Sequence, residues 1–323
     1  MIICGDHTPV PLKCWGKKGG VTLKITDVKA HPLSIPRPQP SWTAHEITTE
    51  AALILVEVRT DAGVIGYGEI QGGPLPLICR LVEQFGEIIR GVDALAHLEV
   101  WEKLFALTSP RPGGIGGRDG LPPPLPRGQR PQIMAAIGGI DIALWDIKGK
   151  AVNMPLYRLL GGARQDLFTY ATGGYYVEGA PLTACAEELG GYVAAVSIPL
   201  AHGEREWHRF TIRDFITSGA IRFMQFDATR HAGFTEALRV ASIAEQHGVS
   251  IAPHTAPHIH GHIVSAFGAS AFGVESHGDP ERHPIQHGMY TAGPEVRDGM
   301  VHLNDLPGLG IEINWAFVKK HRA

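Results

Sequence analysis

The chain has 323 residues, a hydrophobic fraction of 44%, a charged fraction of 19% and a formal net charge of −3. A chain of this length folds as one large domain or two. The small net charge predicts no nucleic-acid partner, and no apolar run reaches the roughly 18 residues that indicate a membrane-spanning helix. The four cysteines are scattered and the opening residues lack the features of a signal peptide. We therefore expect a cytoplasmic protein without a disulfide framework.

The segment that follows an N-terminal tail (residues 1–22) has the pattern of β-strands. Leu23–Ile35 and Ala51–Ile70 are rich in isoleucine, valine and leucine, and the second run contains a turn at Asp61–Gly63. Alternating apolar residues on both sides of a glycine-containing turn are typical of a β-hairpin. The sequence therefore predicts antiparallel strands in this first part of the chain.

Helices are predicted next. Leu77–Leu107 has apolar residues at three- and four-residue spacing, which favours helices. The stretch "TSPRPGGIGGRDGLPPPLPRGQRP" then indicates a loop or a boundary, because glycine and proline interrupt regular structure. A helical pattern returns in "QIMAAIGGIDIALWDIKGKAVNMPLYRLLGG" and stops at a pair of glycines. We place an α+β domain at residues 23–125.

From Leu167 onward, short apolar runs alternate with helical segments. Four consecutive runs end in a polar residue: Glu204, Asp227, His254 and Glu275. Such alternation predicts parallel strands with crossover helices, and the carboxyl ends of the strands are where a (β/α)₈ barrel builds its active site. Each residue alone has a second interpretation as a cap of the next helix. Four of them in register favour a common site.

His254 belongs to a group of four histidines in "IAPHTAPHIHGH". It directly follows the apolar run, so it is expected at the mouth of its strand. His258, His260 and His262 lie on the following loop and helix start. The sequence lacks the glutamate of an H-E-x-x-H metal motif here, so we interpret these three as loop and helix-surface residues rather than metal ligands.

The chain resembles the enolase superfamily, specifically its mandelate-racemase-like subgroup of acid-sugar dehydratases and racemases. The most specific matches are "GIDIALWDIKGK" with "MPLYRLLGG", and the steps of 23 and 27 residues from Glu204 to Asp227 and from Asp227 to His254. The resemblance implies a modified TIM barrel at residues 126–289. It also implies that residues 290–323 complete the first domain as a capping domain over the barrel.

The resemblance further implies a reaction and its residues. The reaction is Mg²⁺-assisted abstraction of the proton α to a carboxylate. Glu204 corresponds to the third carboxylate ligand of the metal, His254 to the general acid/base, and Asp227 to the carboxylate bonded to that histidine. Glu275 corresponds to a glutamate that hydrogen-bonds the substrate. The expected geometry is a contact from Asp227 to one imidazole nitrogen, with the other nitrogen facing the cavity and Glu275 across the mouth.

The sequence around Asp227 and His254 also allows a second arrangement of these two side chains. Asp227 could instead cap the next helix through Thr229 or a backbone amide, with His254 packed under the loop. Adjacent parallel strands lie about 4.8 Å apart, so side chains at their carboxyl ends reach hydrogen-bonding distance. The spacing and the residue types favour the direct contact.

The chain also departs from the family. No lysine occurs between Arg164 and Lys319, so the Lys-x-Lys of relatives has no counterpart here. Neither "DxN" nor "EEP" is present, so the other two metal carboxylates of relatives have no counterpart either. A full barrel takes about 250 residues, whereas Gln165–Ala323 supplies 159. About three βα units are therefore expected to be missing. Either a true internal deletion or an omission from the recorded sequence would explain this, and the intact mass distinguishes them.

Three functional hypotheses follow. The first is an enzyme that dehydrates an acid sugar, with racemisation or epimerisation of a 2-hydroxy acid as the alternative reaction. The second is a catalytically dead relative, and the third, the least favoured, is a zinc hydrolase that uses the histidine cluster. Trp42 and His45, in the loop "RPQPSWTAHE", are the predicted substrate contacts, since polar and aromatic groups suit a hydroxylated acid. The resemblance also implies a homo-oligomer, a dimer or an octamer.

Overall fold

The computed structural model describes residues 2–4, 8–10, 22–42, 47–109, 120–170, 176–177, 199–219, 221–278, 280–281 and 283–323. The strands in these ranges are β1 (Ile2–Cys4), β2 (Thr8–Val10), β3 (Ile25–Trp42), β4 (Ile47–Thr60), β5 (Ile65–Gln71), β6 (Asp166–Tyr170), β7 (Tyr176–Val177), β8 (Ala201–His202), β9 (Phe223–Met224), β10 (Ser250–Ile251), β11 (Val274–Glu275), β12 (Tyr290–Ala292), β13 (Glu295–Arg297), β14 (Met300–His302) and β15 (Glu312–Ile313). The α-helices are α1 (Leu75–Ile89), α2 (His97–Phe105), α3 (Arg130–Ala151), α4 (Leu156–Leu159), α6 (Arg209–Thr217), α7 (Gly233–Gln246), α8 (Pro257–Phe267), α9 (Pro284–Gly288) and α10 (Trp315–Lys320). None of the described helices is long and apolar enough to span a bilayer.

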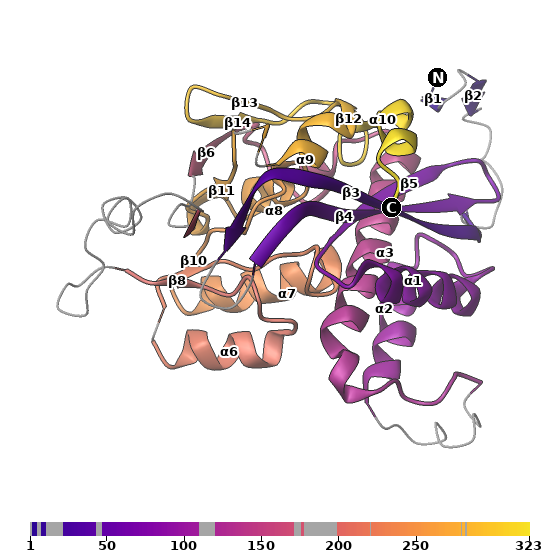
Figure 1. Cartoon of the computed structure of the whole chain (residues 1–323), viewed down its shortest axis with the longest axis horizontal. Helices are drawn as coiled ribbons and strands as arrows, with labels where there is room; N and C mark the ends of the chain where they lie inside the picture. Colours follow the sequence, from indigo (N-terminus) through magenta and orange to yellow (C-terminus); the bar gives the residue numbers. More distant parts are fainter. Residues whose placement is uncertain are drawn as a thin grey trace.

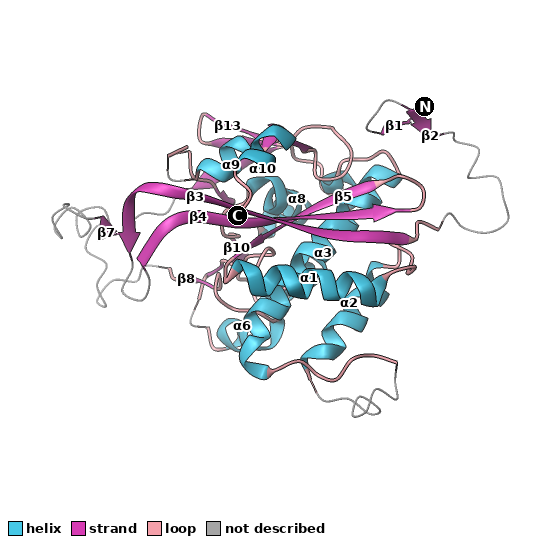
Figure 2. Ribbon diagram, turned by 45° about the vertical axis from the view of Figure 1, so that its right-hand side comes forward, coloured by secondary structure: helices cyan, strands magenta, loops and turns pink. Residues whose placement is uncertain are grey.

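Strands β3, β4 and β5 form an antiparallel meander that crosses the molecule (Figure 2). The predicted strands at Leu23–Ile35 and Ala51–Ile70 are thus confirmed, with the turn at Asp61–Gly63 between β4 and β5. Strand β4 is apolar on both faces. Ile54, with its even-numbered neighbours, enters a core shared with α1 and α3, whereas Leu53 and Leu55 enter a second core shared with α9 and α10. Each such buried side chain contributes roughly 1.5–3 kcal/mol of hydrophobic stabilisation.

Helix α3 lies directly against β5, and glycines make this approach possible. A Cβ atom at Gly68 would overlap the carbonyl of Gly139, and one at Gly66 would overlap the carbonyl of Ala143. The sequences "GYG" on the strand and "GGID" on the helix are therefore complementary. This contact fixes the end of β5, at Gln71, with respect to the rest of the molecule.

The second part of the chain consists of parallel strands joined by helices, as predicted. Strands β8, β9 and β10 pair in parallel, and β11 pairs in parallel with β6. An isolated parallel bridge between Ile251 and Ala271 links the two groups. Helix α7 connects β9 to β10, helix α8 connects β10 to β11, and both pack over a separate apolar core (Figure 1).

The C-terminal segment returns to the first part of the chain. Arg322 forms a bridge with Leu33 of β3, and the side chain of Val318 packs in the core that Leu33 and Leu53 share with α9. The expectation that the tail completes the first domain is consistent with this packing, while the exact boundaries at residues 125 and 290 stay a prediction. Between β6 and β8 the structure describes β7 but not residues 171–175 and 178–198. The missing barrel units therefore also stay a prediction.

Candidate active site at the carboxyl ends of the parallel strands

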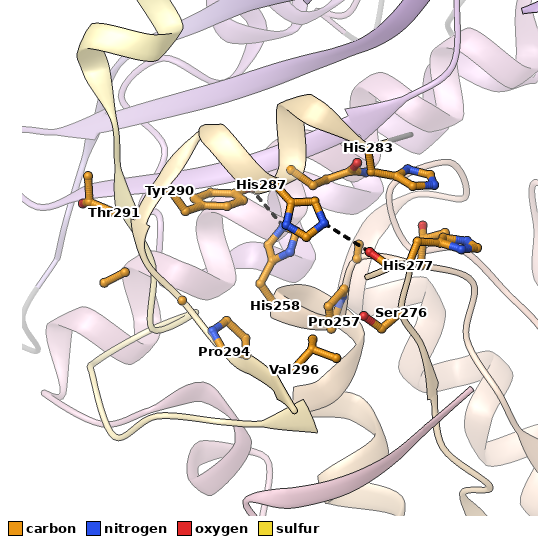
Figure 3. Close-up of a pocket in the computed structure, with 15 residues that line it drawn as sticks. Pro257, His258, Ser276, His277, His283, His287, Tyr290, Thr291, Pro294 and Val296 are labelled. Carbon is orange, nitrogen blue, oxygen red and sulfur yellow. Dashed lines mark hydrogen bonds between the residues drawn. The ribbon is translucent and has the colours of Figure 1, made fainter. Parts of the chain in front are cut away.

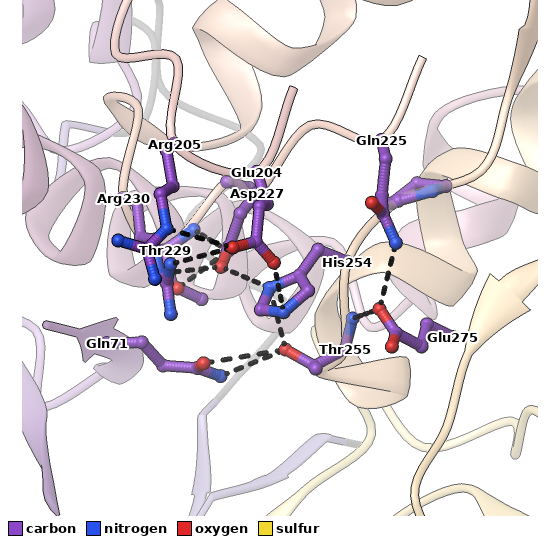
Figure 4. Close-up of polar contacts among 12 residues, drawn as sticks. Gln71, Glu204, Arg205, Gln225, Asp227, Thr229, Arg230, His254, Thr255 and Glu275 are labelled. Carbon is purple, nitrogen blue, oxygen red and sulfur yellow. Dashed lines mark hydrogen bonds and ion pairs between the residues drawn. The ribbon is translucent and has the colours of Figure 1, made fainter. Parts of the chain in front are cut away.

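The four polar residues predicted at strand ends occupy those positions. Glu275 ends β11, and Glu204, Asp227 and His254 each follow within three residues of the ends of β8, β9 and β10. Because these strands are parallel, their carboxyl ends meet at one edge. Figure 4 shows Glu204, Asp227 and His254 grouped together, with Glu275 farther along the same edge.

The predicted contact between Asp227 and His254 is present. Asp227 Oδ2 lies 3.0 Å from His254 Nδ1. The other oxygen of Asp227, Oδ1, accepts hydrogen bonds from the backbone amide and the hydroxyl of Thr229, at 2.9 and 2.7 Å. The two arrangements that the sequence left open therefore coexist: one carboxylate oxygen orients the imidazole and the other closes the loop before α7.

The second imidazole nitrogen does not face an open cavity, and this part of the expectation is wrong. His254 Nε2 lies 2.9 Å from Glu204 Oε2. The ring is thus held between two carboxylates, which satisfy both nitrogens when the ring is protonated. The physical reason is that the imidazole is the nearest of the cationic groups around Glu204, at 2.9 Å against 3.2 Å for Arg205 and 4.0 Å for Arg230.

The electrostatics of the pair follow from this geometry. Burial lowers the pKa of His254, but the hydrogen bonds to Asp227 and Glu204 outweigh burial and raise it to about 9. The hydrogen bond from His254 lowers the pKa of Glu204 to about 2, against the effect of burial. Burial raises the pKa of Asp227, but His254 and Arg230 hold it well below its usual range. At neutral pH His254 is therefore an imidazolium in its resting state.

Two arginines that the sequence interpretation missed complete the cluster. Arg205 Nε lies 3.2 Å from Glu204 Oε1, and Arg230 Nε lies 3.2 Å from Asp227 Oδ2. Arg230 also approaches Glu204 Oε1, with 4.0 Å between the nearest atoms. A signal for both was available, because Arg205 directly follows Glu204 and Arg230 follows Asp227 by three residues, on the same strand-end loops.

Glu275 is fully buried and already bonded. It accepts hydrogen bonds from the Gln225 side chain at 3.3 Å and from the Thr255 amide at 3.2 Å, and its other oxygen lies 3.1 Å from His277 Nε2. Thr255 has a φ of 49°, a left-handed conformation that is costly for a β-branched residue. The bond to Glu275 helps to hold this conformation, and the structure places Glu275 in a supporting position rather than across an open mouth.

The other three histidines of the cluster are buried in α8, so their interpretation as surface residues is wrong. His258 Nε2 lies 3.0 Å from Glu69 Oε2, which also accepts a hydrogen bond from Tyr290. His260 bonds the Thr255 carbonyl and the Ala228 amide. His262 bonds the Tyr157 amide and the Leu309 carbonyl. Each ring is bonded to partners within the protein, and the prediction that these histidines are not metal ligands stays a prediction.

The residues around Glu204 do not fit Mg²⁺, the ion that the resemblance implies. Magnesium requires several oxygen ligands in octahedral geometry. Glu204 instead contacts His254 and two arginines, and no second carboxylate ligand accompanies it among the described residues. Across that part of the chain, no three His, Cys, Asp or Glu side chains form a group able to hold a metal. The expected role of Glu204 as a metal ligand therefore has no support in this geometry.

A cavity of about 250 Å³ lies beside this cluster, between the first part of the chain and the strand ends. Arg205, Trp207 and Arg230 line it from the strand-end loops, and Gln71 and Gln132 line it from the end of β5 and from α3. Gln71 also donates hydrogen bonds to Glu69 at 2.9 Å and to Thr255 at 3.3 Å. The end of β5 is thereby tied to the loop that carries His254.

A second cavity of about 240 Å³, shown in Figure 3, has Thr255 among its lining residues. His258, His277, His287 and Tyr290 line it, and the rings of His277 and His283 are stacked with centroids 4.5 Å apart. The predicted substrate contacts, Trp42 and His45, stay a prediction. Trp42 ends β3, where its side chain is outside the description, and His45 lies outside the described residues.

Two family models match the chain. Residues 25–161 match the N-terminal domain of mandelate racemase and muconate lactonizing enzymes, and residues 178–317 match the enolase C-terminal domain-like family. Among curated relatives, D-galactarolactone cycloisomerase from Agrobacterium fabrum is 27% identical over 90% of this chain and 97% of its own length. D-galactonate dehydratase from Variovorax paradoxus is 24% identical over 81% of this chain and 88% of its own length.

The alignment with the cycloisomerase extends over 388 positions, 65 more than this chain has residues. Because only 90% of this chain is aligned, gaps in this chain fill more than that difference. The alignment length does not place them, and the loss of barrel units stays a prediction.

Solved structures share the fold. A mandelate racemase/muconate lactonizing enzyme superposes with a TM-score of 0.80 and 25% identity, covering 93% of this chain and all of the other. L-talarate/galactarate dehydratase from Salmonella typhimurium LT2, liganded with Mg and L-lyxarohydroxamate, superposes with a TM-score of 0.74 and 21% identity, covering 95% of both chains. The two domain matches and the shared fold show that the chain belongs to the enolase superfamily, in its mandelate racemase and muconate lactonizing enzyme branch.

Proposed function

We propose that the chain dehydrates an acid sugar by moving the proton α to the carboxylate, with His254 as the proton-transfer group. The observation that carries the proposal is the contact between Asp227 Oδ2 and His254 Nδ1 at the carboxyl ends of adjacent parallel strands. The names of the relatives, a galactonate dehydratase and a galactarolactone cycloisomerase, support the substrate class. Family membership likewise supports a cytoplasmic homo-oligomer, which we include in the proposal.

One nitrogen, His254 Nε2, is enough for the whole reaction, because it first accepts the α-proton and then returns it. Neutral His254 Nε2 accepts the α-proton, and the electron pair of that C–H bond forms a double bond to the β-carbon as the β-hydroxyl leaves. The new N–H then protonates the departing hydroxide to give water, and the enol tautomerises to a 2-keto acid. Asp227 holds the ring by Nδ1 and stabilises the imidazolium formed midway.

The resting ion pair has to open before this step. Glu204 occupies Nε2 at 2.9 Å, so the substrate must displace the Glu204 carboxylate from the nitrogen that takes the proton. Arg205 and Arg230 offer Glu204 alternative partners on the side away from His254. Substrate binding and deprotonation of His254 are thus coupled, because both depend on moving the Glu204 carboxylate away from His254 Nε2.

The test is a screen of aldonic and aldaric acids for 2-keto product, with each acid supplied both with EDTA and with millimolar MgCl₂. The expected result is a 2-keto product from at least one acid, and loss of roughly 10²–10⁴-fold in rate for His254→Asn. His247→Asn is the matched control, because His247 is exposed at the end of α7.

Other outcomes separate the alternatives. An epimerised acid without a 2-keto product identifies a racemase or epimerase, because the proton then returns to the opposite face of the same carbon. No reaction with any acid contradicts the proposal and favours a catalytically dead relative. Equal measurable rates for His254→Asn and wild type contradict the assignment of His254 as the proton-transfer group.

A further inference from the structure

The positive charge beside the Asp227–His254 pair is supplied by two arginines. Both guanidinium groups contact Glu204, Arg230 also contacts Asp227, and both side chains line the cavity between the two parts of the chain. Figure 4 shows Arg205 and Arg230 on the same side of the two carboxylates. Arg230 is largely buried, with 27% of its side chain exposed, while Arg205 is 55% exposed.

The charge of this cluster favours an anion. Both guanidinium groups lie within 4.0 Å of Glu204 Oε1 and line the cavity, so they present fixed positive charge to a ligand that enters it. A carboxylate is attracted to that charge. A divalent cation at the same place would face two guanidinium groups near Glu204 Oε1, and repulsion at this range is strong in a partly buried site.

We propose that Arg205 and Arg230 bind the carboxylate of the substrate in this cavity, in place of the divalent cation that the family resemblance implies at Glu204. The proposal rests on the proposed function for the identity of the substrate as an acid sugar. Arginine suits the role because its planar fork of N–H donors matches a carboxylate. As the α-proton leaves, negative charge grows on the carboxylate oxygens, where the guanidinium groups stabilise it.

The rest of the cavity fits hydroxyl groups. Gln71 and Gln132 present side-chain amides from the opposite wall, and an amide both donates to and accepts from a hydroxyl. Gln71 is held in place by Glu69 and Thr255. An acid with a carboxylate at one end and hydroxyls along the chain would therefore lie from the arginines toward β5 and α3.

The test is equilibrium binding of D-galactonate and of galactarate to the full chain by calorimetry, with EDTA and then with millimolar MgCl₂. We expect binding in EDTA, with a Kd that changes less than about 2-fold on addition of magnesium. Arg205→Met and Arg230→Met should each weaken binding about 10-fold or more, as loss of a charge-assisted hydrogen bond predicts. Arg213→Met is the matched control, because Arg213 is 54% exposed and pairs with its neighbour Asp214, as Arg205 pairs with Glu204.

The binding readout is separate from turnover. Binding in EDTA that depends on the arginines, without any 2-keto product, leaves this inference standing and contradicts the proposed function. Binding only in the presence of magnesium, binding that the Arg205→Met variant leaves unchanged, or no binding of either acid under either condition overturns the inference. Arg230 contacts Asp227, so Arg230→Met could also disturb the fold. Its binding result therefore counts only if the far-UV circular dichroism spectrum is unchanged. Arg205 is more exposed, and Arg205→Met is the second, independent variant.

Discussion

Glu204 Oε2 and His254 Nε2 form an ion pair of 2.9 Å beyond the ends of β8 and β10, the two strands that flank β9, on the side of the imidazole opposite Asp227. This pairing determines both the resting protonation of His254 and the order of events when a substrate arrives. A glutamate in this position keeps His254, the proton-transfer group, protonated in the resting state. The following predictions test that arrangement.

The first prediction concerns the pH dependence of catalysis. In Glu204→Gln one of the two carboxylates that raise the pKa of His254 is gone, so that pKa should fall from about 9 toward its ordinary value of 6.5. Because His254 has to be neutral to take the α-proton, the rising limb of kcat/KM should move to lower pH by about one unit or more. A pH–rate profile from 6 to 10 measures this, with Glu206→Gln as the control. An unmoved limb would show that Glu204 does not set the protonation of His254.

The second prediction is the cost of removing the buried carboxylate. Asp227 is fully buried between His254, Arg230 and Thr229, so Asp227→Asn removes the buried carboxylate charge from two cationic groups. Breaking a buried pair in this way costs roughly 3–5 kcal/mol in the free energy of unfolding. Urea unfolding at pH 7 provides the measurement. Asp214→Asn, at an exposed pair with Arg213, should change the same free energy by less than about 1 kcal/mol.

The third prediction is the pH dependence of stability. The pKa of His254 is raised to about 9 in the folded chain from 6.5, so the stabilisation is complete below pH 6.5 and is lost as pH rises through 9. The two values correspond to a loss on the order of 3 kcal/mol across that window. Unfolding free energies at pH 6 to 9.5 should show the decline in wild type and a flatter curve in His254→Asn. Parallel curves for the two proteins would contradict the pairing.

The fourth prediction tests the contact between β5 and α3. Gly68→Ala places a methyl group against the Gly139 carbonyl, so the strand or the helix must shift. Overpacking of this kind destabilises by roughly 1–3 kcal/mol or more. Gly128→Ala is the control, because no atom lies near the position of its Cβ. Thermal unfolding of both variants gives the comparison, and equal melting temperatures would mean that the close packing is not needed.

The regular elements and the strand-end residues could be predicted from the sequence for physical reasons. Strand β4 is apolar without interruption over residues 51–56 because it is covered on both faces, and its β-branched residues still distinguish it from a helix. The contact between Asp227 and His254 follows from parallel topology alone, since both residues follow the ends of neighbouring strands.

The remaining contacts depend on partners that spacing does not reveal. The pairing of His254 Nε2 with Glu204 depends on which cations Glu204 meets in the folded chain, and the arginines of the cluster are not periodic features. Likewise His258 is buried because Glu69, 189 positions earlier in the chain, reaches it from β5. Long-range polar contacts of this kind arise from tertiary packing, which local pattern does not encode.

The central claim, that His254 moves the α-proton, is tested most directly by solvent exchange. The chain is incubated in D₂O with the acid that binds most tightly, and deuterium at the α-carbon of the recovered acid, or at C3 of any 2-keto product, is followed by NMR. The account predicts deuterium incorporation with wild type and with His247→Asn, and none above background with His254→Asn. Equal incorporation by His254→Asn and wild type, or no incorporation by wild type, would contradict it.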